Sequence, residues 1–166
     1  FQALTDKELI GYYKELSNAL KTPLLIYNIP ARTNINVSAD VVRELAKDPY
    51  IIGIKDSTGN IDNLKSYIEA AEGCDFSVLC GSDSKILNAL TLGASGAVAS
   101  TSNLIPEVVV GIYDSYIKDD MDKATEYQDK IECLRKTMHL VGTPAVLKKA
   151  LYMIGINAGD PARPVL

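Results

Sequence analysis

Residues 51–55 read Ile-Ile-Gly-Ile-Lys, and residues 56–59, Asp-Ser-Thr-Gly, follow them directly. A β-branched run bounded by turn residues is typical of a buried strand in a parallel sheet. Lysine is rarely buried without a partner, and desolvation favours its neutral amine, which attacks carbonyl carbons and forms Schiff bases. A lysine at the end of an edge strand can instead extend its ammonium group to water. The segment therefore predicts either a nucleophilic Lys55 or a strand-end lysine.

Short apolar runs alternate with longer helical patterns over the first hundred residues. The predicted strands are centred near residues 26, 53, 79 and 98, a spacing of about 19 to 27 residues, which is the size of one βα unit. The predicted helices between them cover 5–20, 38–46, 60–71 and 86–93. Thr5 and Ser38 are expected to cap the first two of these helices. Four consecutive βα units with apolar strands predict an α/β fold with a parallel sheet under helical cover.

The alternation stops after Ser100. Residues 106–118, 122–138 and 143–154 then predict three successive helices, expected to pack on the helical layer of the sheet or on another subunit. We therefore expect two parts, with βα units in residues 1–104 and a helical extension in residues 105–166.

Composition limits the possible partners. The chain has 166 residues, of which 47% are hydrophobic, enough for one sizeable core. Its formal net charge is −4 without a basic cluster, which argues against nucleic acid and anionic membranes as partners. No apolar run approaches the roughly 20 residues of a membrane-spanning helix. The chain starts at Phe1, already apolar and shortly before a helix, so we expect it to begin within a domain.

Cysteine and histidine are too few for several kinds of site. Cys74, Cys80 and Cys133 show no metal-binding spacing, and Cys80 is expected in the core, so a reducing cytoplasm is the predicted location. His139 is the only histidine, which argues against a histidine-based triad or a multi-histidine metal site, and we expect it at a helix end. No metal and no cofactor is expected.

The unusual residues follow predicted strands, where βα proteins place their active sites. Tyr27 and Lys55 are 28 residues apart, which favours adjacent strands and places a phenol near the amine as a proton relay. Taken alone, Tyr27 could be an ordinary strand aromatic. Arg32 could be solvated or could bind a carboxylate with its planar fork. Residues 81–83, Gly-Ser-Asp, could form a turn or admit a ligand carboxylate at a helix amino terminus.

Four ordered motifs resemble a known family. They are Tyr-Asn-Ile-Pro-Ala-Arg-Thr (27–33), Gly-Ile-Lys-Asp-Ser-Thr-Gly (53–59), Gly-Ser-Asp (81–83) and Gly-Ala-Ser-Gly-Ala-Val-Ala-Ser (93–100). Together they resemble the dihydrodipicolinate synthase and N-acetylneuraminate lyase family, whose members are class I pyruvate-dependent aldolases. The resemblance covers essentially the whole chain but only the carboxyl-terminal part of the family domain. It implies the last four strands of an eight-stranded (β/α) barrel, a TIM barrel, followed by three additional helices.

The resemblance also implies roles for individual residues. Lys55 would form the Schiff base with pyruvate and Tyr27 would relay protons. Arg32 would bind the second substrate, a small aldehyde, while Gly81 and Val98 would line the pyruvate pocket. The family's threonine pair, and a tyrosine that a neighbouring subunit contributes, match no position of this chain. The implied partners are therefore a missing amino-terminal half or further copies, as in the family's tetramer.

Several functions stay open within and beyond the resemblance. The Tyr-Asn-x-Pro-x-Arg-Thr run is most similar to the synthase that condenses pyruvate with aspartate semialdehyde in lysine biosynthesis. Asp56, where many synthases have Glu, and Gly142-Thr143-Pro144, where an Asn-Pro turn is usual, leave room for a 2-keto-3-deoxy sugar-acid aldolase. The residues after Lys55 make a sialic acid lyase less fitting. A truncated, non-catalytic assembly module is a further hypothesis, whereas a flavodoxin-like domain lacks a phosphate-binding loop.

Overall fold

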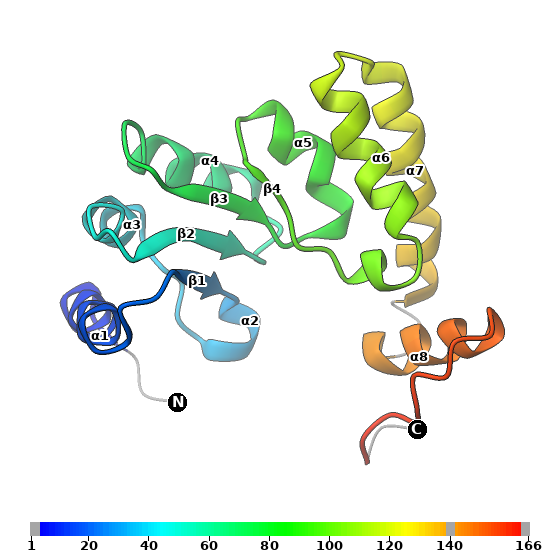
Figure 1. Ribbon diagram of the computed structural model, residues 1–166, viewed down its shortest axis with the longest axis horizontal. Coiled ribbons are helices and arrows are strands. Elements are labelled where there is room, and N and C mark those ends of the chain that lie inside the picture. Colours follow the sequence, from blue (N-terminus) through cyan, green and yellow to red (C-terminus); the bar gives the residue numbers. More distant parts are fainter. Residues whose placement is uncertain (1–3, 139–141, 164–166) are drawn as a thin grey trace. The chain divides into compact units, whose positions relative to one another are not determined.

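The computed structural model describes residues 4–138 and 142–163. The chain forms two compact units, Phe1–Val98 and Ala99–Leu166. Phe1 and His139 lie outside the described residues. Figure 1 shows the strands and their helices in the first unit and a group of helices in the second.

Local sequence signals start the helices of the first unit. Helix α1 (Asp6–Leu20) begins with the predicted capping box, in which the Thr5 hydroxyl accepts from the Glu8 amide and the Glu8 carboxylate accepts from the Thr5 amide at 2.8 Å. The Thr5 amide and the Thr5 hydroxyl both donate to the Glu8 carboxylate, and these two bonds lower the pKa of Glu8 below its usual value. Helix α4 (Ile61–Ala70) is capped by Asn60, and α5 (Ile86–Thr91) follows a short 3₁₀ turn.

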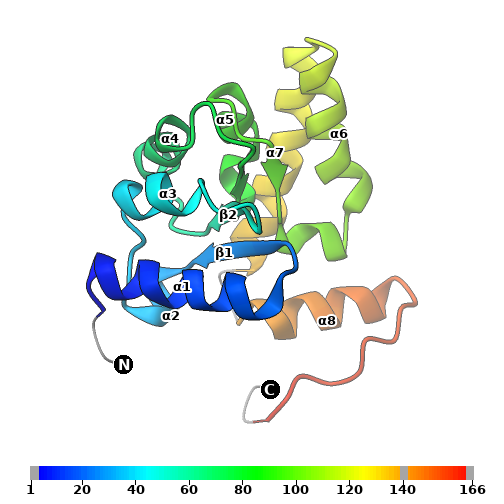
Figure 2. The same cartoon turned by 60° about the vertical axis from the view of Figure 1, so that its left-hand side comes forward.

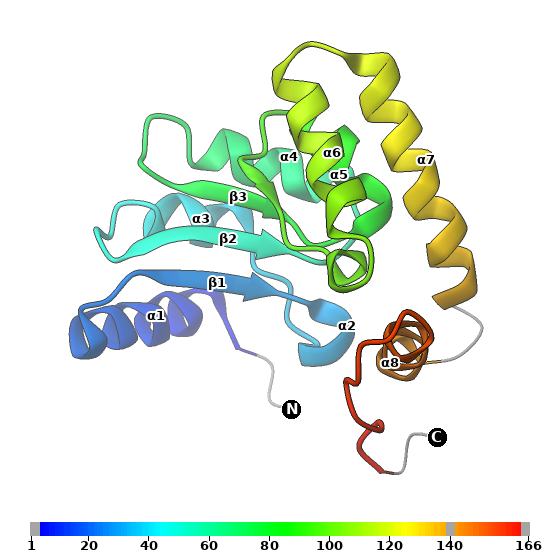
Figure 3. The same ribbon diagram turned by 45° about the vertical axis from the view of Figure 1, so that its right-hand side comes forward.

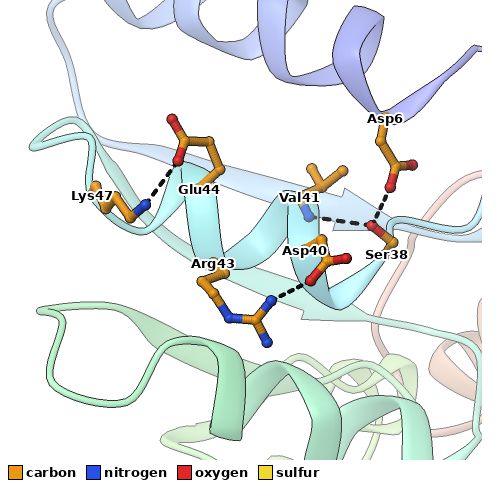
Figure 4. A network of polar contacts seen from close by, with 7 residues as sticks. All are labelled: Asp6, Ser38, Asp40, Val41, Arg43, Glu44 and Lys47. Carbon is orange, nitrogen blue, oxygen red and sulfur yellow. Dashed lines mark hydrogen bonds and ion pairs between the residues drawn. The ribbon is translucent and has the colours of Figure 1, made fainter.

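Ser38 caps α3 (Ala39–Leu45) and also joins it to α1. Its hydroxyl oxygen accepts from the Val41 amide at 3.2 Å and its hydroxyl donates to Asp6 at 2.6 Å, as Figure 4 shows. Lys47 and Lys14 both pair with Glu44 and lower its pKa to about 2. The predicted caps at Thr5 and Ser38 are thus confirmed, and the second one fixes two helices relative to each other.

The sheet has four parallel strands in sequence order. They are β1 (Leu24–Asn28), β2 (Ile51–Asp56), β3 (Ser77–Cys80) and β4 (Gly96–Ala97). The register of β1 against β2 shifts between Leu24 and Leu25 and is regular from there to the strand ends. Strand β4 is the shortest of the four, and residues 100–103 form a 3₁₀ turn shortly after it. The predicted parallel α/β fold is confirmed.

The hydrophobic core lies on one face of this sheet. Ile26, Ile54 and Val78 point to that face and are buried against helices α1, α3 and α4, which contribute Leu9, Val41, Val42, Leu45, Leu64 and Tyr67. Figures 2 and 3 show α1 and α3 side by side along the strands. Leu25, 50% exposed, belongs to the opposite face, and Ile52, 40% exposed, lies at the register shift near the start of β2. Within this unit the helices therefore cover one face of the sheet, and the opposite face is open.

A short helix that the sequence pattern did not reveal follows β1. Helix α2 (Pro30–Thr33) starts with proline at its first position and ends at Asn34 in the left-handed region, with φ of 58°. Proline lacks the amide hydrogen that the first helical turn leaves unpaired, so it suits this position. Arg32 therefore lies on a single helical turn directly after β1.

The second unit consists of helices. After the turn Ser100–Asn103 come α6 (Pro106–Ile117), α7 (Met121–Met138) and α8 (Thr143–Met153), as predicted within a few residues. Helices α6 and α7 pack closely at Gly111, where an added β-carbon would lie 2.7 Å from the Tyr127 ring. None of the helices in the described part of the chain is long and apolar enough to cross a membrane.

Candidate active site

Tyr27 and Lys55 lie opposite each other on neighbouring strands. They are register partners of β1 and β2, and the Lys55 Nζ is 4.4 Å from the centroid of the Tyr27 ring. A cation at this distance from the ring face is attracted by the ring quadrupole. No hydrogen bond joins the Tyr27 hydroxyl to the amine among the described residues, so the contact is with the ring itself. The predicted adjacency of the two residues is confirmed.

Both side chains belong to the open face of the sheet. Lys55 is half-buried, rather than fully buried as its apolar neighbours suggested, and Tyr27 is 50% exposed. Strand alternation explains the difference, because Ile26 and Ile54 point into the core while the residues that follow them point away from it. The lysine is therefore accessible to a small molecule from this face of the unit.

Gly81 lies beside Lys55 at the end of β3. Its amide donates to the Asp56 carbonyl oxygen at 2.7 Å, so the strands remain paired one residue past their ends. A β-carbon added at Gly81 would lie 2.9 Å from Lys55 Cε and 2.1 Å from Ser57 Oγ. Glycine thus leaves the space that the lysine side chain occupies.

Val98 follows β4 and donates its amide to the Cys80 carbonyl oxygen at 2.8 Å. Because Gly96 is the register partner of Leu79, alternation places Val98 on the same face as Lys55, and its side chain is 48% exposed. Arg32, by contrast, is exposed on α2 and has no ion pair with any described residue. The structure brings Tyr27, Lys55, Gly81 and Val98 to one face, with Arg32 on the segment that leaves β1.

A buried polar cluster lies on the other side of the same strand ends. Asn28 and Asp56, 1% and 2% exposed, are register partners, and the Asn28 amide group donates to the Asp56 carboxylate at 2.8 Å. Thr58 donates its hydroxyl to the same carboxylate at 2.6 Å, and the Asn63 amide approaches it at 3.3 Å. A buried carboxylate is stable here because neutral donors surround it.

Tyr67 of α4 completes this cluster. Its hydroxyl lies 3.0 Å from the Asn28 amide nitrogen and donates a short hydrogen bond to the Val37 carbonyl oxygen. Burial is the main reason that the pKa of Tyr67 is raised to about 12, and the nearby Asp56 charge adds to the effect. The phenol therefore stays protonated and donates to the Val37 oxygen.

Asn28 and Tyr67 are not among the site residues predicted from the sequence. A signal for Asn28 was present, since a polar residue at a core-facing position next to Tyr27 needs buried partners. Tyr67 gave no such signal, because it lies within a regular helical pattern of the sequence. No cluster of three or more potential metal ligands occurs among the described residues.

The family model described as the dihydrodipicolinate synthetase family matches residues 1–166. The chain is 31% identical over 166 residues to a 4-hydroxy-tetrahydrodipicolinate synthase of Caldicellulosiruptor bescii, covering 99% of this chain and 55% of that protein. The chain thus spans about half the length of the curated relatives it matches.

Solved structures show the same similarity. Dihydrodipicolinate synthase from Bacteroides thetaiotaomicron is 32% identical with a TM-score of 0.89, covering 96% of this chain and 56% of that one. YagE, a prophage protein of the dihydrodipicolinic acid synthase family from E. coli K12, was solved with pyruvate. It is 30% identical with a TM-score of 0.87, covering 98% of this chain and 57% of YagE. The match to the family model along the whole chain, together with these likenesses, means that the chain belongs to the dihydrodipicolinate synthetase family.

Proposed function

We propose that this chain carries the Schiff-base lysine of a pyruvate-dependent lyase, a 4-hydroxy-tetrahydrodipicolinate synthase. The observation that carries the proposal is the contact between Lys55 and Tyr27, with Nζ 4.4 Å from the ring centroid, on the open face of the sheet. Family membership and the pyruvate complex of YagE support pyruvate as the first substrate. Aspartate semialdehyde is the second substrate in the proposed reaction.

The residues can be assigned to steps of this chemistry. The neutral amine of Lys55 attacks the carbonyl carbon of pyruvate, and the carbinolamine takes up a proton and loses water to leave an iminium ion. The Tyr27 hydroxyl, at the end of a ring already in contact with the lysine, relays protons during these steps. Loss of a methyl proton then gives an enamine that forms the new carbon–carbon bond with the aldehyde.

Gly81 and Val98 are proposed to line the pyruvate pocket, and Arg32 to bind the carboxylate of the second substrate. Gly81 supports this role by admitting the lysine side chain, and Val98 by its exposed apolar side chain on the same face. The exposed guanidinium of Arg32 follows directly on the strand that carries Tyr27. We also keep the cytoplasm as the proposed location, in agreement with three free cysteines.

The chain is further proposed to be the carboxyl-terminal half of a (β/α)8 barrel, in residues 1–104, with a helical extension in residues 105–166. Four parallel strands with helices on one face supply half of such a barrel. A cavity of 220 Å³ lies between α1, the end of β1 and the loop after α2, and is lined by Tyr12, Tyr13 and Tyr27 among others. The missing half, or a second copy, would cover the open face.

A second candidate is a non-catalytic assembly module. It is favoured by the exposure of apolar side chains on the open face, where Leu25 is 50% and Val98 is 48% exposed. Such a module would use this face for association alone, and Lys55 would form no adduct.

Borohydride trapping separates the two candidates. The expressed protein is incubated with labelled pyruvate, reduced, digested and mapped by mass spectrometry. We expect one reduced adduct, on Lys55, and none in Lys55→Arg, because a guanidinium stays protonated. Lys85→Arg is the matched control and should be labelled as the original chain is. A label on Lys85 or Lys148, or no label at all, would contradict the catalytic proposal.

The half-barrel proposal needs a different measurement. Unpaired strand edges and an uncovered apolar face favour association, since burial of apolar surface contributes about 25 cal/mol per Å². We expect light scattering combined with intact mass to show either a second polypeptide or a dimer of this chain. A stable, monodisperse 18.0 kDa monomer without a second polypeptide would refute it.

A further inference from the structure

The catalytic pair and the buried polar pair occupy consecutive positions on the same two strands. Tyr27 is opposite Lys55, and the next residues, Asn28 and Asp56, are opposite each other. Successive side chains of a strand point to opposite faces, so the first pair lies on the open face and the second in the core. The two pairs therefore share the same stretch of backbone at the ends of β1 and β2.

Asn28 is held in one orientation. Its side-chain oxygen accepts from the Val37 amide at 3.1 Å, which directs its nitrogen toward the acceptors around it. These acceptors are Asp56 at 2.8 Å, Asn36 at 2.9 Å and Tyr67 at 3.0 Å. A buried side chain with this many partners has little freedom to rotate.

Asp56 is held with comparable strength. Its two carboxylate oxygens accept from Asn28, Thr58 and Asn63, and it forms no ion pair with any described lysine or arginine. Its backbone is fixed as well, because its carbonyl oxygen accepts from the Gly81 amide at 2.7 Å. The Ser57 amide, next in the chain, donates to the Asn28 carbonyl oxygen at 2.9 Å.

The cluster extends beyond what strand pairing alone requires. The backbone ladder between β1 and β2 already exists, yet side chains from the following loops and from α4 also converge on these two residues. Burial of a carboxylate is costly unless donors compensate for it, so a purely structural role would be met more simply by apolar side chains.

We propose that Asn28 and Asp56 are positioning residues for Tyr27 and Lys55, and that their hydrogen bond sets the spacing of the lysine amine from the tyrosine ring. This inference rests on the proposed function for its catalytic consequence but not for its structural one. Supporting groups of this kind typically change rates about 10- to 100-fold when removed.

The first test is spectroscopic and needs no activity. The protein is labelled with isotopic lysine and studied by NMR. We expect the Tyr27 ring current to shift the resonance of the Lys55 ε-methylene group. The Tyr27→Leu variant, which lacks the ring, identifies this resonance. Asn28→Ala and Asp56→Ala should lose much of this shift. Asp56→Asn should keep most of it, because its amide oxygen still accepts from Asn28 and its nitrogen can donate to the Thr58 hydroxyl.

Asp48→Ala is the matched control. Asp48 precedes the other end of β2 and also accepts a side-chain hydrogen bond, from Ser17 at 2.6 Å, together with one from the Tyr50 amide at 3.0 Å. Its removal should lower the thermal unfolding temperature without changing the Lys55 signal. If the alanine variants of the cluster do not fold, Tyr67→Phe, which removes one partner of Asn28, should give a smaller change in the same direction.

Trapping with pyruvate and borohydride is the second test. Asp56→Ala should form the Lys55 adduct about 10- to 100-fold more slowly, and Asp56→Asn should recover most of the rate. An unchanged Lys55 signal in the variants that fold, or an equal change in Asp48→Ala, would overturn the positioning role. If the Lys55 signal changes in the cluster variants but the original chain never forms the pyruvate adduct, the positioning role is supported and the catalytic proposal is refuted.

Discussion

Gly81 and Lys55 share a space that holds only one side chain. A β-carbon at Gly81 would come within 2.9 Å of Lys55 Cε and 2.8 Å of the Asp56 carbonyl oxygen. The lysine side chain is flexible, but the backbone oxygen belongs to a paired strand and cannot move freely. The absence of a side chain at Gly81 is therefore a condition for the observed position of Lys55.

Gly81→Ala should slow formation of the pyruvate adduct about 10- to 100-fold, because the lysine must leave its place. Overpacking of this kind also destabilises by about 1–3 kcal/mol. Trapping rates and thermal unfolding measure the two effects. Gly96→Ala is the control on the same face, since its β-carbon would meet only Leu79, at an ordinary 3.8 Å. Equal trapping rates in the two variants would contradict the crowding argument.

Tyr27→Phe removes the hydroxyl and keeps the ring that contacts Lys55. We expect the amount of trapped pyruvate to change little, while turnover with the aldehyde falls about 10²- to 10⁴-fold through loss of a proton relay. Steady-state kinetics beside trapping tests this. Tyr12→Phe, on the exposed side of α1, should behave as the original chain does. An unchanged turnover rate in Tyr27→Phe would show that the tyrosine serves in packing only.

Arg32→Ala should raise the KM for the second substrate and leave pyruvate trapping intact, because the guanidinium is assigned to a carboxylate at the mouth of the site. The comparison is Arg43→Ala, which removes an equally exposed arginine that pairs with Asp40 on α3. Kinetics with each substrate varied in turn distinguishes the roles. A defect limited to pyruvate would assign Arg32 to the first substrate.

Tyr67 should give stability a characteristic dependence on alkaline pH. Burial raises its pKa from 10.0 to about 12, so the folded chain keeps the phenol proton over a range in which the unfolded chain loses it. The contribution of Tyr67 to the free energy of unfolding is complete below pH 10 and declines as the pH rises toward 12. Denaturant unfolding across this range should show a weaker decline in Tyr67→Phe than in Tyr12→Phe. Identical pH profiles would contradict the assignment.

Much of the fold could be predicted because its signals are local. Thr5 and Ser38 begin their helices through bonds to residues three positions away, and that spacing is visible in the sequence. The placement of Tyr27 beside Lys55 was also predictable, since one βα unit between two parallel strands makes them neighbours.

Other features depend on contacts that no local pattern encodes. The hydrogen bond between Asn28 and Tyr67 joins residues 39 positions apart, and neither residue type is unusual in its own segment. Ile52 is exposed at the register shift between β1 and β2, an irregularity that the apolar sequence around it does not reveal. Strand β4 has two residues, and residues 100–103 form a 3₁₀ turn after it. The small residues of this segment are compatible with a turn but do not predict one.

The alternation of side chains along β1 and β2 has a consequence for how such a protein can change over generations. Ile26 and Ile54 maintain the folded state, whereas Tyr27 and Lys55 one position later face outward. A substitution on the outward face changes the functional groups there without creating a cavity in the core. The outward face can therefore change its side chains while the buried residues keep the free energy of unfolding.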